Sequence, residues 1–273
     1  MKVRFLGTAA AEGIPAIWCE CEVCRKARKL KGKELRRRCS YLIDNDTIVD
    51  YGPDGYWQSI EYDIDQTELK RILFTHPHED HMAPLEFAYR WSPIFSHVSH
   101  FINVLASKEA LKNFLKTTGM DFKTLNINTM PFVAGEWTTD DDMQVLPIPA
   151  NHAPGLGAMI LVVRRGGKTL LIANDTGLLA DASWDMLKGI KLDTAVIEST
   201  CAFGSPDQQN GHLGVNATVL FRDKLLEMQC ITETTPVYVN HFSHNGRANH
   251  DRLVEFFAPR NMTVTYDGLE IEL

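Results

Sequence analysis

Three histidines and an aspartate stand close together in the run His76-Pro77-His78-Glu79-Asp80-His81. Imidazole and carboxylate groups are common protein ligands of Zn, Mn and Fe. The run directly follows residues 71–75, which read as a strand. In an extended segment, side chains two positions apart point the same way, so His76 and His78 can bind one ion together. Asp80 and His81 lie at the following turn and can reach a second ion. This spacing predicts a metal-dependent hydrolase with a binuclear centre; the alternative is a polar surface loop.

A second group of metal-binding residue types comes earlier, where Cys19, Cys21 and Cys24 fall within six residues. Clustered thiols in a reducing compartment indicate a metal site rather than disulfides. A structural zinc takes four ligands, so three cysteines require a fourth partner. The other cysteines are scattered, and the best candidate is His244, in Asn240-His241-Phe242-Ser243-His244. The alternative is a surface loop with free thiols.

The elements that must position these residues are short strands alternating with helices. We expect strands at residues 2–6, 41–43, 47–49, 71–75, 100–106, 144–148, 158–163, 169–173, 194–197, 236–239 and 262–266. We expect helices at residues 108–116, 215–228 and 249–257. Nothing resembles a linker, so residues 1–273 are predicted to form a single layered domain. Residues 117–142 show no clear periodicity and are interpreted as a lid or an insertion.

The composition of the chain restricts the kinds of partner that we expect it to bind. The 273 residues carry a formal net charge of -7, which argues against a nucleic-acid partner because such proteins normally present a basic surface. The basic segment 26–38 is the local exception, and we interpret it as a solvated helix face or loop. The chain opens without a signal peptide, and no apolar run approaches the roughly 20 residues of a membrane span. We therefore expect a cytoplasmic protein without a membrane partner.

The H-x-H-x-D-H run at a strand end resembles the signature of the metallo-β-lactamase superfamily. That resemblance implies an α+β fold, a four-layer αββα sandwich with the metal site at one edge of its sheets. It also implies further ligands at later strand ends, and the matching residues are His152, Asp175 and His241. Each of them follows an asparagine and a predicted strand. Taken singly, each histidine could be an ordinary loop residue and Asp175 could cap a turn.

The same resemblance implies how the ligands are shared. His76, His78 and His152 would bind one ion, Asp80, His81 and His241 the other, and Asp175 would bridge the two. Asp50 matches the first motif of the superfamily, which implies that it orients a ligand histidine by a hydrogen bond. The alternative for Asp50 is a turn residue before Gly52.

A closer resemblance is to the PhnP-type branch of this superfamily, whose characterised members open 1,2-cyclic phosphates of ribose in phosphonate breakdown. It is carried by the C-x-C-x-x-C loop after Gly7-Thr8, the H-x-H-x-D-H run and the late His-x-x-His, and it spans the chain from Leu6 to Gly268. It implies that Cys19, Cys21, Cys24 and His244 hold one structural zinc in a loop at about residues 12–39. It also implies that His212 is a non-ligand histidine that assists departure of the ester oxygen. A surface histidine is the alternative.

These observations lead to a mechanistic hypothesis. A hydroxide bridging two divalent metals attacks a small cyclic phosphodiester such as ribose 1,2-cyclic phosphate, and His212 protonates the leaving oxygen. Asp80 is assigned both to the ligands and to the catalytic residues. The resemblance favours Mn in the active site, although the ligands also suit Zn or Fe, and it implies a homodimer. The alternatives are an RNA-processing nuclease, a thioester hydrolase or lactamase of the same superfamily, and a metal-stabilised binding module without activity.

Overall fold

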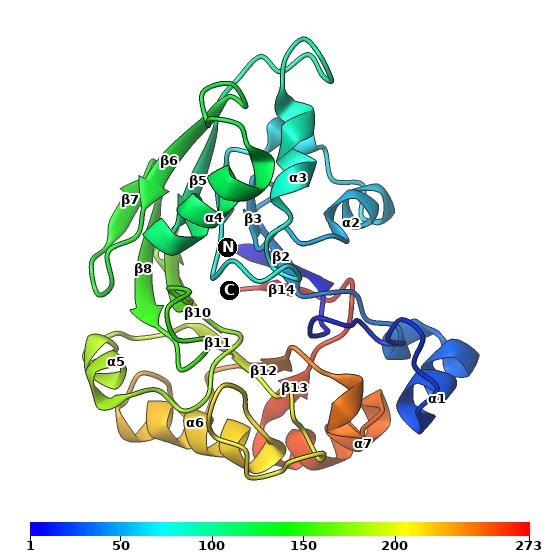
Figure 1. Ribbon diagram of the computed structural model, residues 1–273. Coiled ribbons are helices and arrows are strands. Elements are labelled where there is room, and N and C mark those ends of the chain that lie inside the picture. The colour runs from blue at the N-terminus through cyan, green and yellow to red at the C-terminus, as the bar shows by residue number, and fades with distance from the viewer.

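The computed structural model describes residues 1–273, and its two sheets face each other (Figure 1). The first sheet has the strand order β14-β1-β2-β3-β4-β5-β6. Its strands are β1 (Lys2–Gly7), β2 (Ser40–Ile43), β3 (Thr47–Val49), β4 (Arg71–Leu73), β5 (Ile102–Ala106), β6 (Ile127–Pro131) and β14 (Glu270–Glu272). The last strand of the chain, β14, thus pairs with the first, β1, and forms one edge of this sheet.

The second sheet has the order β13-β12-β11-β10-β9-β8-β7. Its strands are β7 (Thr138–Asp140), β8 (Met143–Pro149), β9 (Met159–Arg165), β10 (Lys168–Ala173), β11 (Thr194–Glu198), β12 (Val237–Asn240) and β13 (Met262–Val264). Every strand predicted from the sequence is present within two residues of its expected ends.

The helices are α1 (Glu22–Leu30), α2 (Gly55–Glu61), α3 (Pro84–Phe87), α4 (Lys108–Thr118), α5 (Asp181–Met186), α6 (Val215–Glu227) and α7 (His250–Phe257). Short 3-10 helices lie at Gly32–Glu34, Gln66–Glu68, Ala88–Arg90, His244–Gly246 and Ala258–Arg260. Helix α4 shows how single residues determine where a helix begins and ends. The Ser107 side chain caps its first turn by accepting from the Ala110 N–H, and Gly119 ends it in the left-handed conformation at φ 63°.

Alternating side chains build three apolar layers. In β10, Leu170 and Ile172 belong to the core between the sheets, whereas Leu171 and Ala173 belong to the core under the helices of the second sheet. That second core includes Phe221 of α6 and Leu253 of α7, among others. A third core lies between the first sheet and helices α3 and α4. Two sheets with helices on both outer faces form the four-layer αββα sandwich, so the predicted fold class is confirmed.

Strand direction determines where functional side chains gather. Strands β3 to β6 are parallel to one another, as are β10 to β13. Strand β8 runs in the direction of β10, because both are antiparallel to β9. The carboxyl ends of parallel strands meet at one edge of a sheet, which is where ligands bind in open sheets of this kind.

Two expectations are corrected. Residues 117–142 form neither a lid nor an insertion, because they complete α4 and supply β6 and β7, the neighbouring edge strands of the two sheets. The basic segment 26–38 is not solvated throughout, because Arg36 is 4% exposed and donates to the Thr265 carbonyl and to the Thr8 hydroxyl.

No helix is both long and apolar enough to cross a membrane.

Candidate metal centre

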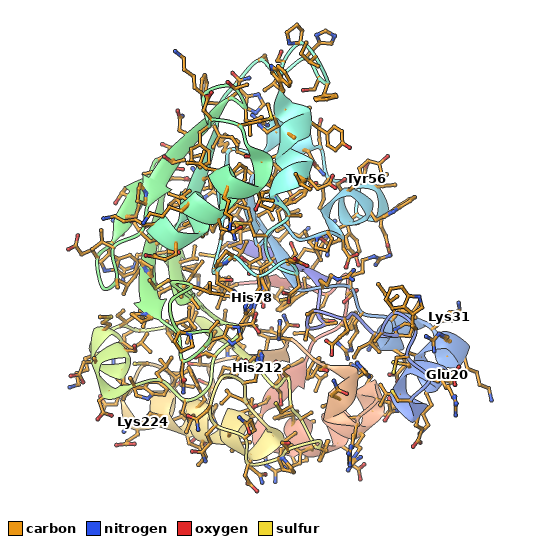
Figure 2. All side chains as sticks on the ribbon, in the orientation of Figure 1. Glu20, Lys31, Tyr56, His78, His212 and Lys224 are labelled. Carbon is orange, nitrogen blue, oxygen red and sulfur yellow. The ribbon has the colours of Figure 1, made fainter.

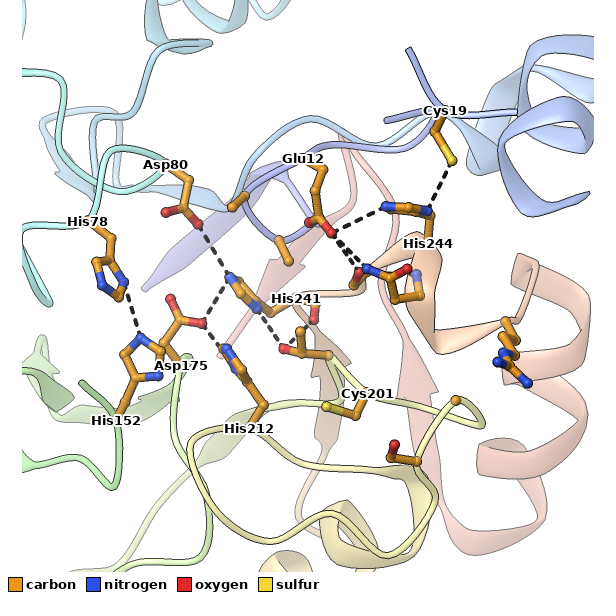
Figure 3. Close-up of a pocket in the computed structure, with 18 of the residues that line it drawn as sticks. Glu12, Cys19, His78, Asp80, His152, Asp175, Cys201, His212, His241 and His244 are labelled. Carbon is orange, nitrogen blue, oxygen red and sulfur yellow. Dashed lines mark hydrogen bonds and ion pairs between the residues drawn. The ribbon is translucent and has the colours of Figure 1, made fainter. Parts of the chain in front are cut away.

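Side chains from both sheets meet in one place. His76, His78, Asp80 and His81 follow β4, whereas His152, Asp175 and His241 follow β8, β10 and β12 of the other sheet. Figure 3 shows those that line the pocket, namely His78, Asp80, His152, Asp175 and His241. Figure 2 shows the same meeting at lower magnification, with His78 and His212 on opposite sides of the space between the two halves. The structure therefore brings together all seven residues that the sequence assigned to the active-site metals.

The first donor group consists of His76, His78 and His152, and one ring nitrogen from each lies within 4.8 Å of the other two. The Nδ1 atom of His78 is 2.8 Å from Nε2 of His76 and 3.1 Å from Nε2 of His152. Three imidazole nitrogens converging in this way match the donor set of a Zn, Mn or Fe ion.

The second donor group consists of Asp80, His81, Asp175 and His241, and all four are buried. The Nε2 atom of His81 lies 3.0 Å from Asp80 Oδ2 and also contacts Asp175. The Nε2 atom of His241 lies 3.3 Å from Asp175 Oδ1. Asp175 Oδ2 also lies 3.4 Å from Nε2 of His76, so this carboxylate stands between the two groups.

Hydrogen bonds fix the tautomers of the histidines. His81 places Nδ1 at 2.7 Å from the Asp50 carboxylate, and His152 places Nδ1 at 3.0 Å from the Gly211 carbonyl. Both partners can only accept, so each Nδ1 carries a proton and Nε2 is the ring atom that faces the centre. Such outer partners are a regular feature of metal-binding histidines.

Asp50 is fully buried at the end of β3 and serves more than one neighbour. Its Oδ1 accepts from the Thr75 N–H at 2.8 Å, and its Oδ2 accepts from the Thr75 hydroxyl at 2.8 Å as well as from His81. The carboxylate thereby ties the end of β3 to the turn after β4, in agreement with the orienting role inferred for it.

The backbone at the strand ends is strained. Asp50, Asp175 and His241 have φ values of 61°, 44° and 59°, a region that residues other than glycine seldom adopt. Strain of this kind persists only where the surroundings impose it, and it concentrates at functional sites. Three such residues at one edge indicate that the surrounding structure imposes an unfavourable backbone conformation there in order to place these side chains.

The charge balance of the second donor group fits a cation. Burial favours the neutral ring, yet the carboxylates of Asp80, Asp175 and Asp50 raise the pKa of His81 well above its usual value. The Nε2 atoms of His81 and His241 are buried, and although carboxylate oxygens lie close to them, neither atom makes a hydrogen bond of normal geometry. Buried polar atoms are normally satisfied. A divalent cation would satisfy these nitrogens and the facing carboxylates together, so the residues present fit a metal.

His212 lies beside this centre, and its partner is a residue that sequence reasoning missed. Its Nδ1 atom is 2.9 Å from Oε1 of Glu198 and 3.4 Å from Oδ1 of Asp175. Although burial opposes the charged ring, these carboxylates raise the pKa of His212 to about 9. Glu198 is fully buried and also accepts from the backbone N–H groups of Thr176, Thr200 and Leu213. The signal that could have revealed it is an acidic residue at the end of the apolar strand β11.

The cysteine group, Cys19, Cys21, Cys24 and His244, forms a separate site next to the first helix. The Nδ1 atom of His244 lies 3.4 Å from Cys19 Sγ and 3.5 Å from Cys21 Sγ. Its Nε2 atom faces Oε1 of Glu12 at 3.3 Å. No cysteine of the chain is in a disulfide. Three thiols and an oriented histidine match the four-ligand set of a structural zinc.

One cleft of about 880 Å³ connects the two sites. It is lined by His78, Asp80, His152, Asp175, His212 and His241 at one side and by Cys19, Cys21 and His244 at the other. The loop with the cysteines lies beside the sandwich, as the labels of Glu20 and Lys31 in Figure 2 indicate. The cysteine group therefore helps to shape the wall of the cleft without joining the first two groups.

Comparison with known proteins identifies a family. The family model described as "Beta-lactamase superfamily domain" matches residues 46–242. Among curated proteins, an octanoyltransferase of Porphyromonas gingivalis is 33% identical over 90 residues, which is 32% of this chain. The matched part spans only 17% of that relative's own length.

Solved structures share the fold along the whole chain. A diphosphatase of the PhnP family covers 100% of this chain and 96% of its own, with a TM-score of 0.74 and 20% identity. Zn-bound PqqB from Methylobacterium extorquens covers 100% of both chains, with a TM-score of 0.73 and 16% identity. The short form of human tRNase Z covers 100% of this chain and 99% of its own, with a TM-score of 0.64 and 15% identity.

Proposed function

The chain belongs to the beta-lactamase superfamily, and from that membership we propose that it is a binuclear metal-dependent phosphodiesterase acting on small cyclic phosphodiesters. The observation that carries the proposal is the position of Asp175 between two donor groups, with His212, which is paired with the buried Glu198, lining the same cleft. Ribose 1,2-cyclic phosphate represents the substrate class.

The metal ligands follow from the two donor groups. His76, His78 and His152 would hold one ion, Asp80, His81 and His241 the other, and Asp175 both. When bound, divalent ions there would supply a nucleophile from water at neutral pH and offset the charge on the phosphoryl oxygens. The nitrogen and oxygen donors suit Mn, Zn or Fe, whereas the cysteine group suits Zn.

His212 would hold and deliver the proton that the departing oxygen requires. Its Nδ1–H donates to Glu198, which leaves Nε2 as the atom that can give a proton to the leaving group. The side chain is 31% exposed, so the proton can be replaced from solvent after each turnover. General acid assistance of this type is typically worth roughly 10²–10⁴-fold in rate.

The substrate class rests on the likeness to the PhnP-type branch and on the acidic chain. Proteins that bind RNA normally carry a basic surface, so a formal net charge of -7 favours a small ester over a transfer RNA precursor, with segment 26–38 as the local exception. Thioester cleavage would use the same donor groups but would not need a general acid for an alkoxide.

The test is an activity panel with purified protein and added Mn²⁺. It compares ribose 1,2-cyclic phosphate, 2′,3′-cyclic nucleotides, bis(p-nitrophenyl) phosphate, a precursor tRNA and a thioester. We expect preferred turnover of the cyclic phosphates and its loss in Asp80→Ala. A protein that cleaves the thioester or the RNA and leaves every small phosphodiester intact would overturn the substrate assignment while keeping the metal centre.

A further inference from the structure

A group of polar side chains is buried between the two apolar sheets, behind the candidate metal centre. It consists of Cys39, Tyr41, Asn174, Asn240 and Thr265, and none of them is more than 1% exposed. Cys39 and Tyr41 belong to the apolar core between the sheets, where they lie among valine, leucine and isoleucine side chains. Burying polar groups in such surroundings is unfavourable unless they bond to one another.

These five residues form a closed hydrogen-bond network, which we call the inter-sheet network. The Sγ atom of Cys39 accepts from Nδ2 of Asn174 and from Nδ2 of Asn240, each at 3.1 Å. The Tyr41 hydroxyl accepts from Asn240 Nδ2 at 2.7 Å and donates to Asn174 Oδ1 at 2.7 Å. Thr265 donates to Asn240 Oδ1 at 2.5 Å. Each asparagine side chain is therefore hydrogen-bonded at its oxygen and at its NH2 group.

The two asparagines occupy matching places in the fold. Asn174 follows β10 and directly precedes Asp175, while Asn240 ends β12 and directly precedes His241. Asp175 and His241 both have left-handed backbone, at φ 44° and 59°. A residue in that conformation turns the chain sharply, so the direction of its side chain depends on how firmly the preceding residue is held.

The network also crosses from one sheet to the other. Tyr41 lies in β2 and Cys39 just before it, both in the half of the chain that supplies His76, His78, Asp80 and His81. Asn174 and Asn240 lie in the half that supplies Asp175 and His241. The distance of 3.3 Å between Asp175 and His241, and the position of both against His81, thus rests on a bonded connection between the sheets.

We propose that Tyr41 and Cys39 are positioning residues for the metal centre, which act through Asn174 and Asn240 to set Asp175 and His241 against the donors of the first sheet. This inference rests on the proposed metal centre but does not depend on which ester is cleaved. Removing one member leaves a buried amide group of Asn174 or Asn240 without a partner, which lowers stability as well as loosening the amide. Metal affinity is therefore measured on variants that are shown to be folded, and a control variant accounts for the loss of stability.

The experiment titrates the metal-free, folded chain with Co²⁺ and follows each site by its own signal. Thiolate-to-cobalt charge-transfer absorption reports binding to the cysteine group. Visible d–d bands that rise without added charge-transfer absorption report binding to the nitrogen and oxygen donors. In Tyr41→Phe and Cys39→Ala we expect the affinity of the latter site to fall about 10–100-fold, the usual effect of losing a partner behind a metal ligand. The cysteine-group signal should be unchanged, and Cys39→Ser should recover most of the affinity.

Cys230→Ala is the matched control, because Cys230 is 1% exposed and bonds only to the Leu187 carbonyl in the outer core. It should keep wild-type Co²⁺ affinity even where its unfolding midpoint in urea falls as far as that of Cys39→Ala. Wild-type affinity in folded Tyr41→Phe and Cys39→Ala, or an equal loss in Cys230→Ala, would overturn the inference. A wild-type chain that binds Co²⁺ only through its thiols would instead refute the metal centre itself.

Discussion

The Nδ1 atom of His212 lies 2.9 Å from Oε1 of Glu198, and this pair adjoins Asp175 and His241 of the second donor group. Glu198 also holds three backbone N–H groups from the loops after β10 and β11 and before α6. One buried carboxylate thus fixes the histidine and the loops that border it. Asp175 and His241 therefore face both the other metal-binding side chains and the histidine suited to move a proton.

Removing the imidazole should affect substrates unequally. In His212→Ala, the rate on ribose 1,2-cyclic phosphate should fall roughly 10²–10⁴-fold, because an alkoxide leaves poorly without a proton. The rate on bis(p-nitrophenyl) phosphate should change by less than about tenfold, because its phenolate needs no general acid. Metal content should remain that of the wild type. His97→Ala, which removes a histidine that does not line the cleft, is the control, and equal losses on both substrates would argue against the acid role.

Glu198→Gln should reproduce part of the same selectivity. The amide keeps the size of the side chain, but its NH2 group cannot accept and must face two of the four N–H groups that Glu198 binds, so the hold on His212 and its loops weakens. We expect about a tenfold to hundredfold loss on the cyclic phosphate and a smaller one on the aryl ester. Steady-state kcat on both substrates measures this. Glu34→Gln is a matched control, because Glu34 is 8% exposed and accepts from the His250 backbone N–H away from the cleft. A Glu198→Gln enzyme with wild-type kcat on the cyclic phosphate would contradict the pairing.

The cysteine group should contribute to stability. Cys21→Ser removes a thiol that caps α1 and lies 3.5 Å from His244, so the chain should lose one equivalent of zinc and melt several degrees lower. For a chain of this size, each kcal/mol is worth about 2–4 °C. Elemental analysis and calorimetry provide the two readouts. Cys230→Ser should retain the zinc, and full zinc retention in Cys21→Ser would exclude the assigned ligand set.

Acid should destabilise the fold through His250. Burial and the neighbouring Arg36 guanidinium lower the pKa of His250 to about 4. The unfolded chain takes up a proton near pH 6.5, but the folded chain does so only near pH 4, so stability is lost as the pH falls through this window. We expect His250 to account for about 1–3 kcal/mol of that loss. Urea unfolding at pH 7 and pH 5 should show a smaller decline in His250→Gln than in the wild type, and equal declines would count against His250.

Strong local patterns made most of the fold and the donor groups predictable. Residues 71–81 combine a buried strand with closely spaced donors, and the strands of the second sheet are apolar enough to be read individually. Three of the four edge strands, β6, β7 and β14, gave no such signal. Strand β14 (Glu270–Glu272) and strand β7 (Thr138–Asp140) contain no buried residue, so their sequences carry neither alternation nor an apolar run. Pairing with a neighbouring strand, which local sequence does not encode, places them in the sheets.

Glu198 and Arg36 were missed for a related reason. A charged residue is normally solvated, and only tertiary contacts reveal that Glu198 accepts four hydrogen bonds or that Arg36 faces the Thr265 carbonyl and the His250 ring. The partners of Arg36 lie 28 to 229 residues away along the chain. Sequence patterns report local periodicity, whereas these roles depend on what folding brings together.

The segment after β12 supplies His241 to one site and, three residues later, His244 to the other. During synthesis both sites therefore stay incomplete until this segment has left the ribosome, however early the other donors appear. A chain that terminates before residue 241 would lack a donor at each site at once. The metal binding proposed for the two sites would thus require a chain that extends at least through His241 and His244.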